Sequence, residues 1–145
     1  MRKEIFVVAL LLLSSLFLAG CVDKEESSEN GTATITWYSY QEGVHKAKKE
    51  GKPVLVDFYA DWCGPCRMMD EYTYTNDKVI AKVSSNFVAV KVDVDVEQNI
   101  AAFYSIYSIP TVVYLNSEGK EIYRTVGYRD VGQFINDMNI ALQRT

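Results

Sequence analysis

The sequence is short of several residue types, and each shortage excludes a class of function. Its 145 residues include a single histidine, which rules out a histidine-rich metal site. There are 15 lysines and arginines against 19 aspartates and glutamates, so the formal net charge is −4 and the pI is about 5.0. Nucleic-acid binding through phosphates needs a basic excess, so we expect no nucleic-acid partner. Three cysteines are an odd number, which fits poorly with a scaffold of structural disulfides.

The first 20 residues have the pattern of a secretory signal peptide. A short basic start from Met1 to Glu4 precedes an apolar run over residues 5–20, which two serines interrupt. At 16 residues this run is short for a membrane-spanning helix, which needs about 20. We therefore predict a signal peptide over residues 1–20 that is removed on export.

The end of the apolar run, Leu18-Ala19-Gly20-Cys21, resembles the lipobox of prokaryotic lipoproteins. The resemblance implies cleavage before Cys21 and a diacylglycerol on its thiol, which removes this cysteine from redox chemistry. Two acyl chains are enough for stable anchoring. The alternative is an uncleaved anchor with a buried cysteine. We expect an exported protein that Cys21 anchors to the outer face of the cytoplasmic membrane, or a location in the periplasm.

Residues 21–33 are predicted to form the lipidated N-terminus and a flexible linker. After the cysteine they are polar and acidic, with almost no large apolar side chains. Asn30-Gly31-Thr32 matches the N-glycosylation acceptor pattern, but such triplets are frequent by chance. We interpret the stretch as a linker and place the folded domain, which we expect to be a monomer, in residues 34–145.

The remaining residues alternate between strand and helix patterns. Near-continuous apolar runs are typical of strands covered on both faces, whereas apolar residues at helical spacing indicate amphipathic helices. Strands are predicted at residues 34–38, 53–59, 87–94, 111–115 and 121–126, and helices at residues 41–50, 63–72, 77–84, 96–104 and 130–142. This order predicts an α/β domain with a central mixed β-sheet flanked by helices on both faces.

A cysteine pair, Cys63 and Cys66, lies in a Trp-Cys-Gly-Pro-Cys motif where a predicted strand gives way to a helix. The spacing allows a small disulfide, and unpaired N–H groups at a helix start stabilise a thiolate on the first cysteine. Cys63 is therefore the expected nucleophile, and Cys66, one turn into the helix and less exposed, resolves the mixed disulfide. Half of a zinc site is one alternative, but His45 alone remains as a typical further ligand. An inert structural disulfide is the other.

Residues 56–66, Val-Asp-Phe-Tyr-Ala-Asp-Trp-Cys-Gly-Pro-Cys, resemble the active-site segment of the thioredoxin family, and the similarity extends over residues 51–145. Residues 51–74 look closer still to the C-terminal thioredoxin-like domain of the thiol:disulfide interchange protein DsbD. That relative is extracytoplasmic, but its motif lacks the Gly-Pro spacer. The resemblance implies a thioredoxin fold and a redox-active disulfide between Cys63 and Cys66, with no cofactor.

The same resemblance implies roles for three residues away from the cysteine pair. Pro110, in Ser-Ile-Pro-Thr, matches the family's cis-proline, which faces the disulfide and leaves neighbouring backbone groups free to pair with substrate. Asp57 matches the buried aspartate that accepts and returns the proton of Cys66, and burial should raise its pKa. Lys91 matches the lysine expected near that aspartate. A surface aspartate at a strand end and an ordinary strand-start proline are the alternatives.

An apolar rim around the nucleophile is expected to bind extended or unfolded substrates, as in the family, and its members are Trp62, Gly64, Pro65, Ile109 and Gly127. Tyr128 can join this rim. Asp70 lies four residues after Cys66, on the same helix face, where a carboxylate would hold the cysteine pKa values up. A solvated surface role is the alternative for Asp70.

These features predict an extracytoplasmic thiol–disulfide oxidoreductase that reduces or exchanges disulfides in exported proteins. Gly-Pro between the cysteines and Ile109 before Pro110 resemble the reducing thioredoxin branch more than the oxidising DsbA type. A reducing enzyme outside the cell needs electrons, so the family implies a membrane thiol-transfer protein as electron donor. The alternatives are an oxidase or isomerase of the same fold, and a non-enzymatic lipoprotein that binds copper or an assembly partner through its cysteines.

Overall fold

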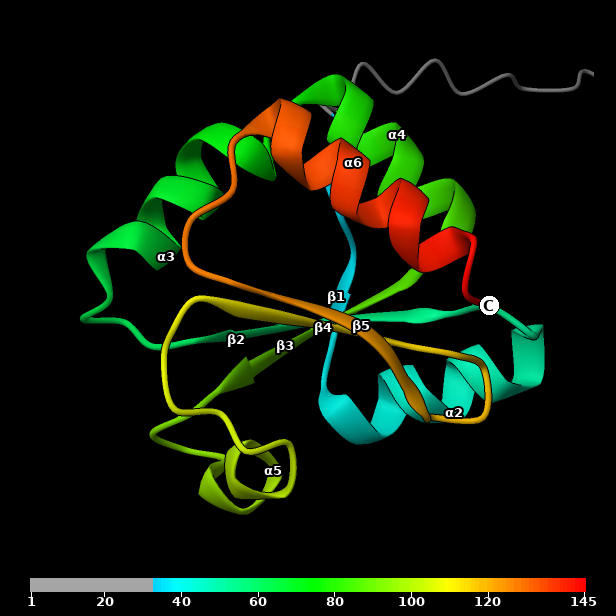
Figure 1. The fold of residues 1–145 in the computed structure, drawn as a ribbon, viewed down its shortest axis with the longest axis horizontal. Coiled ribbons are helices and arrows are strands. Elements are labelled where there is room, and N and C mark those ends of the chain that lie inside the picture. Colours follow the sequence, from blue (N-terminus) through cyan, green and yellow to red (C-terminus); the bar gives the residue numbers. More distant parts are fainter. Residues whose placement is uncertain (1–32) are drawn as a thin grey trace, which may run out of the picture. The chain divides into compact units, whose positions relative to one another are not determined.

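The central sheet is built from strands rich in β-branched and aromatic residues, which suit a pleated surface covered on both sides. In the computed structural model, which describes residues 33–145, the strands are β1 (Trp37–Tyr38), β2 (Val54–Tyr59), β3 (Val88–Asp93), β4 (Thr111–Leu115) and β5 (Glu121–Val126) (Figure 1). Their order across the sheet is β1-β3-β2-β4-β5. Because β2 pairs in parallel with β3 and antiparallel with β4, the sheet is mixed and β2 is its central strand.

Helices cover both faces of this sheet (Figure 1). They are α2 (Tyr40–Glu50), α3 (Gly64–Met68), the π-helical turn η1 (Met69–Thr73), α4 (Asp77–Asn86), α5 (Gln98–Phe103) and α6 (Val131–Leu142). α2 and α5 lie on one face, whereas α3, α4 and α6 lie on the other. The predicted mixed sheet with helices on both faces is thereby confirmed.

Each face of the sheet packs into its own hydrophobic core. Towards α4 and α6 the strands contribute Leu55, Ala89, Val112 and Tyr114. Towards α2 and α5 they contribute Val54, Val56, Phe58, Val90 and Val113. Successive side chains of a strand point to opposite faces, so Asp57, two residues beyond Leu55, faces the α4 and α6 side.

The helix predicted at residues 63–72 is divided in the structure. α3 ends and continues as η1, in which the N–H of Tyr74 donates to the carbonyl of Met69 over 2.8 Å. Thr73, at the end of η1, is fully buried, and its hydroxyl donates to the carbonyl of Arg129 over 2.7 Å. A π turn holds one residue more than an α turn and so changes the direction of the residues that follow. The hydrogen bond of Thr73 with Arg129 joins residues 56 apart in the sequence. No local sequence pattern therefore indicates the division of this helix.

Two other predicted elements are shorter in the structure. The strand predicted at residues 34–38 is confined to the two residues of β1, which pair with β3. The helix predicted at residues 96–104 begins at Gln98, because a turn whose N–H groups donate to the carbonyl of Asp93 precedes it.

The predictions for the N-terminal region lie outside the described residues. They are the signal peptide at residues 1–20, the lipid on Cys21, the linker that follows it and the acceptor triplet at Asn30. Within residues 33–145, no helix has the length and apolar character needed to cross a bilayer.

Helix α2 approaches β3 closely at a glycine. A Cβ added to Gly43 would lie 2.1 Å from Cγ2 of Val90, a side chain that is fully buried in β3. Protein interiors are close-packed, so the valine has no free space to move into. Position 43 therefore requires glycine for packing, although glycine is a poor helix former.

Gly43→Ala is expected to lower the free energy of unfolding by about 1–3 kcal/mol, because overpacking outweighs the better helix propensity of alanine. Gly132→Ala in α6 is the matched control. Its added Cβ would lie 3.5 Å from Asp130, an ordinary contact, so it should stabilise the protein by up to about 1 kcal/mol. Urea unfolding of the purified protein measures both changes. A Gly43→Ala variant as stable as the parent would contradict the close approach.

Candidate active site

The cysteine pair lies just beyond the C-terminal end of the central strand, where α3 begins (Figure 1). Cys63 is the N-cap of α3, Cys66 lies in its first turn, and their sulfurs form a disulfide with an S–S distance of 2.06 Å. Pro65 also lies in this turn, where its missing N–H leaves no helical hydrogen bond unmade. The disulfide predicted from the motif is confirmed.

Backbone hydrogen bonds hold the loop that carries the first cysteine. The N–H of Cys63 donates to the carbonyl of Ala60 over 3.1 Å, and the guanidinium of Arg67 donates to the carbonyl of Asp61 over 2.9 Å. The N–H of Cys66 donates to Sγ of Cys63 over 3.2 Å. When the disulfide is reduced, this N–H is placed to stabilise a thiolate on Cys63.

The predicted difference in exposure between the two cysteines is wrong for the disulfide form. Both residues are buried, with 3% of Cys63 and 4% of Cys66 exposed. The closed disulfide brings the Cys63 sulfur over the backbone of Cys66, so the two residues shield each other. The hydrogen bond to its sulfur distinguishes Cys63, whereas exposure does not.

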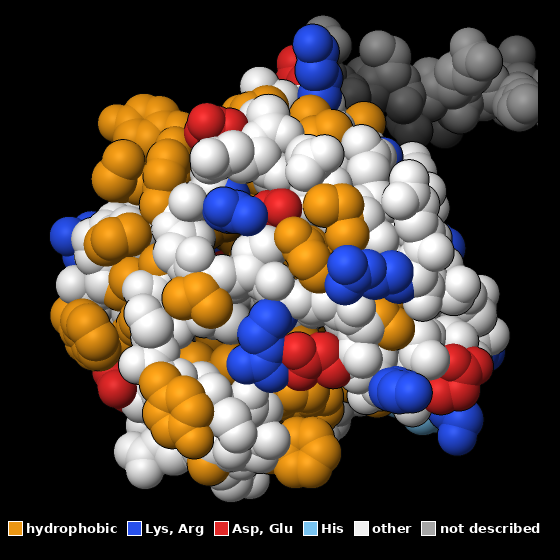
Figure 2. Space-filling model, viewed as in Figure 1, with side chains coloured by type: hydrophobic (Ala, Val, Ile, Leu, Met, Phe, Trp, Pro, Cys, Tyr) orange, Lys and Arg blue, Asp and Glu red, His pale blue; other side chains and the backbone are white. Residues whose placement is uncertain are grey.

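An apolar groove of about 360 Å³ begins at Trp62, the residue directly before Cys63, and its other walls are Val94, Ile106, Tyr107, Ser108 and Ile109. Trp62 is 68% exposed, but its indole N–H donates to Oδ2 of Asp95 over 2.8 Å, which fixes its orientation. Figure 2 shows hydrophobic side chains gathered on the side of the molecule that carries α3 and α5. A concave apolar surface next to a disulfide suits the side chains of a polypeptide.

Strand β4 brings Pro110 to the same end of the sheet as the disulfide. Thr111, the first residue of β4, pairs with Phe58 near the end of β2. The proline before it therefore lies beside the chain that leads to Cys63. The peptide bond between Ile109 and Pro110 is cis, as predicted.

Only some of the residues predicted to form the substrate rim line the groove. Trp62 and Ile109 line it together, whereas the two residues between the cysteines are not among its walls. Gly127, with a φ of +90°, lies next to Pro110 and donates its N–H to the proline carbonyl over 2.8 Å. Tyr128 packs against the core on the α6 side.

Several residues of the groove were not predicted from the sequence, namely Val94, Ile106, Tyr107, Ser108 and the anchoring Asp95. Three of them directly precede Ile109, so the apolar residues beside the Ile-Pro-Thr motif were the available indication. Tyr107 is 94% exposed, which is unusual for a large aromatic side chain. The contact of Asp95 with Trp62 joins loops 33 residues apart, so no local pattern indicates it.

Asp57 is buried in the middle of β2, as predicted, and only 2% of it is exposed. Burial raises the pKa of its carboxyl to about 6, although the Lys91 ammonium acts in the opposite direction. Its Oδ1 has no hydrogen-bond partner. A carboxyl that titrates close to neutral pH can take up and release a proton during a reaction cycle.

Lys91 lies on β3 directly opposite Asp57. Its Nζ is 3.6 Å from Oδ2 of Asp57 and 2.5 Å from Oδ1 of Asp70. Three aromatic rings also contact this ammonium, with centroids 4.5, 5.2 and 5.6 Å from Nζ, and they belong to Tyr59, Trp37 and Tyr74. Cation–π attraction and the two carboxylates therefore hold the Lys91 side chain in place between them. The sequence indicated the pairing with Asp57 but not the three rings, which come from separate segments.

Asp70, in η1, is the second carboxylate that pairs with Lys91. Its hydrogen bond is with Lys91, and its negative charge raises the pKa of Asp57. Because the Asp70 side chain is partly exposed, it links the buried pair to solvent.

Metal ligands are sparse in the part of the chain that the structure describes. Residues 33–145 contain no group of three or more histidine, cysteine, aspartate or glutamate side chains placed to hold an ion. The sulfurs of Cys63 and Cys66 are bonded to each other, so in this state neither offers a thiolate to a metal.

The family model for thioredoxin matches residues 31–139, which include the sheet, the disulfide and Pro110. The chain belongs to the thioredoxin family. Membership of this family shows a thioredoxin-like thiol–disulfide oxidoreductase with Cys63–Cys66 as its redox-active disulfide.

Individual thioredoxins support this assignment. The chain is 32% identical over 118 residues to thioredoxin of Mycolicibacterium smegmatis, a match that covers 80% of this chain and 99% of the relative. The solution structure of a thioredoxin from Thermus thermophilus superposes with a TM-score of 0.68 at 27% identity, over 73% of this chain and 85% of the other.

The chain is also similar to part of a longer protein. It is 32% identical over 100 residues to the thiol:disulfide interchange protein DsbD of Yersinia pestis. The match covers 63% of this chain but only 16% of DsbD. The similarity therefore concerns one part of DsbD.

Asp57→Asn is expected to stabilise the oxidised protein at pH 8 by up to about 3 kcal/mol, from a pKa of about 6 in the folded state and 3.8 for the free group. Above pH 6 the parent must bury a charged carboxylate, whereas the variant buries a neutral amide. Below pH 4 the carboxyl is protonated in both the folded and unfolded states, so the difference should vanish.

Urea unfolding at pH 8 and pH 3.5 measures this change for Asp57→Asn. Glu118→Gln, in the exposed turn between β4 and β5, is the control and should have little effect at either pH. A variant that is less stable than the parent at pH 8 would show that burial does not disfavour the charged form.

Asp70→Asn is expected to lower the pKa of Asp57, because it removes a nearby negative charge and leaves the Lys91 ammonium to Asp57 alone. The ¹³C chemical shift of the Asp57 carboxyl, followed against pH, measures the change. Glu71→Gln in the same turn is the control and should leave this titration in place. An unchanged or raised midpoint in Asp70→Asn would refute the coupling.

Proposed function

We propose that this chain is an exported, lipid-anchored oxidoreductase that reduces or exchanges disulfides in exported proteins. The observation that carries the proposal is the Cys63–Cys66 disulfide, together with the apolar groove whose walls include Trp62, the residue directly before Cys63, and Ile109, the residue directly before the cis-proline. The groove provides binding surface for a polypeptide, and the disulfide provides the reacting group.

The reaction has two steps. The Cys63 thiolate attacks one sulfur of a substrate disulfide, and the other substrate sulfur leaves as a thiolate that takes a proton from solvent. Cys66 then gives its thiol proton to the Asp57 carboxylate, and its sulfur attacks Sγ of Cys63. The second substrate thiolate is released, two electrons have passed to the substrate, and Cys63 and Cys66 are left as a disulfide.

The substrate is an extended segment that contains a disulfide-bonded cysteine. Pro110 has no N–H, so the backbone around Ile109 is free to pair with such a segment. Trp62 stays in place for an incoming side chain because Asp95 holds its indole N–H. A folded substrate would have to open locally before its disulfide could reach the buried sulfur of Cys63.

Two features favour reduction as the direction of electron flow. The Gly-Pro spacer between the cysteines and Ile109 before Pro110 resemble reducing thioredoxins. Each turnover oxidises the cysteine pair, so a reductant must restore it. Outside the cytoplasm a membrane thiol transferase would supply these electrons, and the similarity to the thiol:disulfide interchange protein DsbD supports a partner of that kind.

The N-terminal sequence supports the location. The apolar run over residues 5–20 ends at Leu-Ala-Gly-Cys, and the polar residues after Cys21 provide a linker between the lipid and the domain. A tethered enzyme of this kind acts on proteins that pass or reside near the membrane surface.

Cys66→Ala in the full-length chain is expected to accumulate mixed disulfides between Cys63 and exported proteins, because the resolving sulfur is absent. These complexes should occur in the membrane fraction, and should move to the soluble fraction when residues 1–21 are replaced by a signal peptide that is cleaved without lipidation. Non-reducing electrophoresis of the two fractions, followed by mass spectrometry, identifies the trapped partners.

The Cys63→Ala/Cys66→Ala variant is the control and should trap nothing. Trapped partners that are all cytoplasmic would contradict the location. The reduction potential of the cysteine pair tests the direction of electron flow. A value close to that of thioredoxin, about −270 mV, supports reduction. A value close to DsbA's, about −120 mV, would contradict it.

A further inference from the structure

The segment between β5 and α6, residues 127–130, is fixed in place by contacts with three other parts of the fold. Its first residue, Gly127, donates its N–H to the carbonyl of Pro110 over 2.8 Å. This contact follows from the sheet register, because Val126 at the end of β5 pairs with Thr111 at the start of β4. The segment therefore begins beside the cis-proline at the disulfide end of the sheet.

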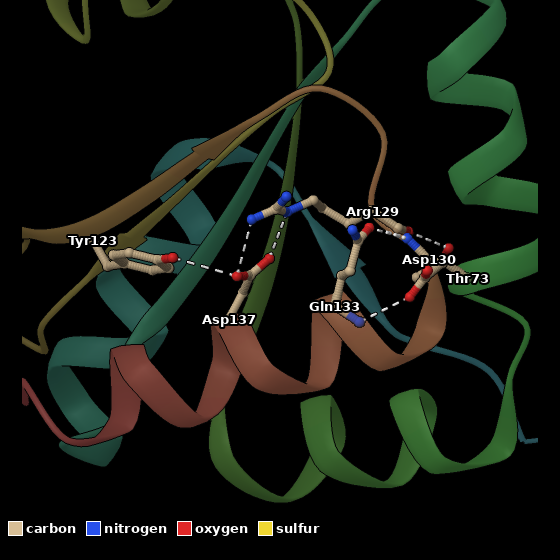
Figure 3. Close-up of polar contacts among 6 residues, drawn as sticks. All are labelled: Thr73, Tyr123, Arg129, Asp130, Gln133 and Asp137. Atoms are coloured by element: carbon tan, nitrogen blue, oxygen red, sulfur yellow. Dashed lines mark hydrogen bonds and ion pairs between the residues drawn. The ribbon is translucent and has the colours of Figure 1, made fainter.

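Arg129 connects the same segment to the helix of the resolving cysteine. Its carbonyl accepts a hydrogen bond of 2.7 Å from the hydroxyl of Thr73, the last residue of η1 (Figure 3). η1 continues directly from α3, which carries Cys66. One backbone contact thus links the segment that touches Pro110 to the helix that begins at the disulfide.

The Arg129 side chain makes a second, independent attachment. Its Nε donates to Oδ2 of Asp137 over 2.8 Å and its Nη2 donates to Oδ1 over 3.2 Å (Figure 3). Asp137 lies on α6 and is almost fully buried, and the hydroxyl of Tyr123 on β5 also donates to its Oδ1 over 3.3 Å. The forked pairing fixes the direction of the guanidinium as well as its distance from the carboxylate.

The end of the segment is held by the start of α6. Asp130 caps this helix, accepting from the N–H of Gln133 over 2.8 Å, while its own N–H donates to the Gln133 side chain over 3.1 Å. This capping box sets the direction in which the chain enters α6. Residues 127, 129 and 130 are therefore each tied to a different neighbour.

Only the acid of this ion pair is fully buried, with 3% of the Asp137 side chain and 28% of the Arg129 side chain exposed. The hydration that the charges lose can equal the attraction between them, so the pair need not stabilise the fold. Apolar residues of similar size could fill the space of Arg129 and Asp137 at little or no loss. An apolar pair would not fix the orientation of residue 129, however. In the structure the forked pairing fixes it, and the carbonyl of Arg129 accepts the hydrogen bond from Thr73. The pair is therefore better explained by geometry than by stability.

We propose that Arg129 is a positioning residue for exchange with protein substrates: through Asp137 and Thr73 it sets Gly127 and Pro110 relative to the helix of the two cysteines. It does not touch the substrate or the sulfurs. Loosening it should weaken binding of a polypeptide that spans the disulfide and the proline, and should leave intact the reaction with a small disulfide that meets the sulfurs alone. The proposal rests on thiol–disulfide exchange and is independent of where in the cell the enzyme acts.

The test compares two substrates, insulin and hydroxyethyl disulfide, with the double variant Arg129→Met/Asp137→Leu. It removes both charges together, so no unpaired carboxylate is left buried. The expected result is a KM for insulin that rises about three- to tenfold at little change in kcat, the range for couplings carried through side-chain networks. The rate with hydroxyethyl disulfide should be unchanged.

Two further variants make the result specific. Thr73→Val removes only the hydroxyl contact to the Arg129 carbonyl, and it should raise the KM for insulin in the same direction even if the double variant folds poorly. Lys46→Met/Glu50→Leu in α2 is the control, since it also removes both partners of an ion pair but lies outside residues 127–130 and outside the groove.

The control should leave the KM for insulin unchanged. An unchanged KM in folded Thr73→Val and double-variant proteins would overturn the proposal. So would an equal loss of activity with both substrates, because that is the result of a merely structural role.

Discussion

The two-sided pairing of β2 is the constraint on which the rest of the site depends. Its ladder with β3 puts Lys91 opposite Asp57, and its ladder with β4 puts Pro110 beside the chain that leads to Cys63. A slip of one residue in either ladder would turn every side chain of the strand to the opposite face. The close-packed cores on both faces disfavour such a slip, because each side chain would have to fit the opposite core and Asp57 would leave Lys91. Strand register therefore aligns the acid, the lysine, the proline and the disulfide together.

Two buried carboxylates on the same side of the sheet show how different surroundings suit the same group to different tasks. Asp137 and Asp57 are equally buried. The former accepts three hydrogen bonds, two from Arg129 and one from Tyr123, which satisfy both of its oxygens. The latter has one oxygen without a partner and a lysine shared with another acid. A fully bonded carboxylate holds neighbouring segments in place, whereas an incompletely bonded one can exchange a proton.

The features that could be predicted from the sequence are those that residues close together in the chain determine. Apolar runs of strand length indicated the sheet, and the cysteine motif indicated the disulfide. The resemblance to the thioredoxin family indicated the buried Asp57 and the cis bond before Pro110. The division of the helix predicted at residues 63–72, the aromatic rings around Lys91 and the walls of the groove were not predictable in this way. Each depends on segments that meet only in the folded chain, as Thr73 and Arg129 do across 56 residues.

The antiparallel ladder between β2 and β4 joins distant parts of the chain, with Val56 opposite Val113. Closing so long a loop is entropically costly, so such pairings form after local helices and turns. A chain that is still folding therefore carries both thiols before it has the proline and the groove beside them. Its sulfurs can react at that stage, but they have no means of choosing a partner. Docking of β4 is thus the event that turns a pair of reactive thiols into a selective enzyme.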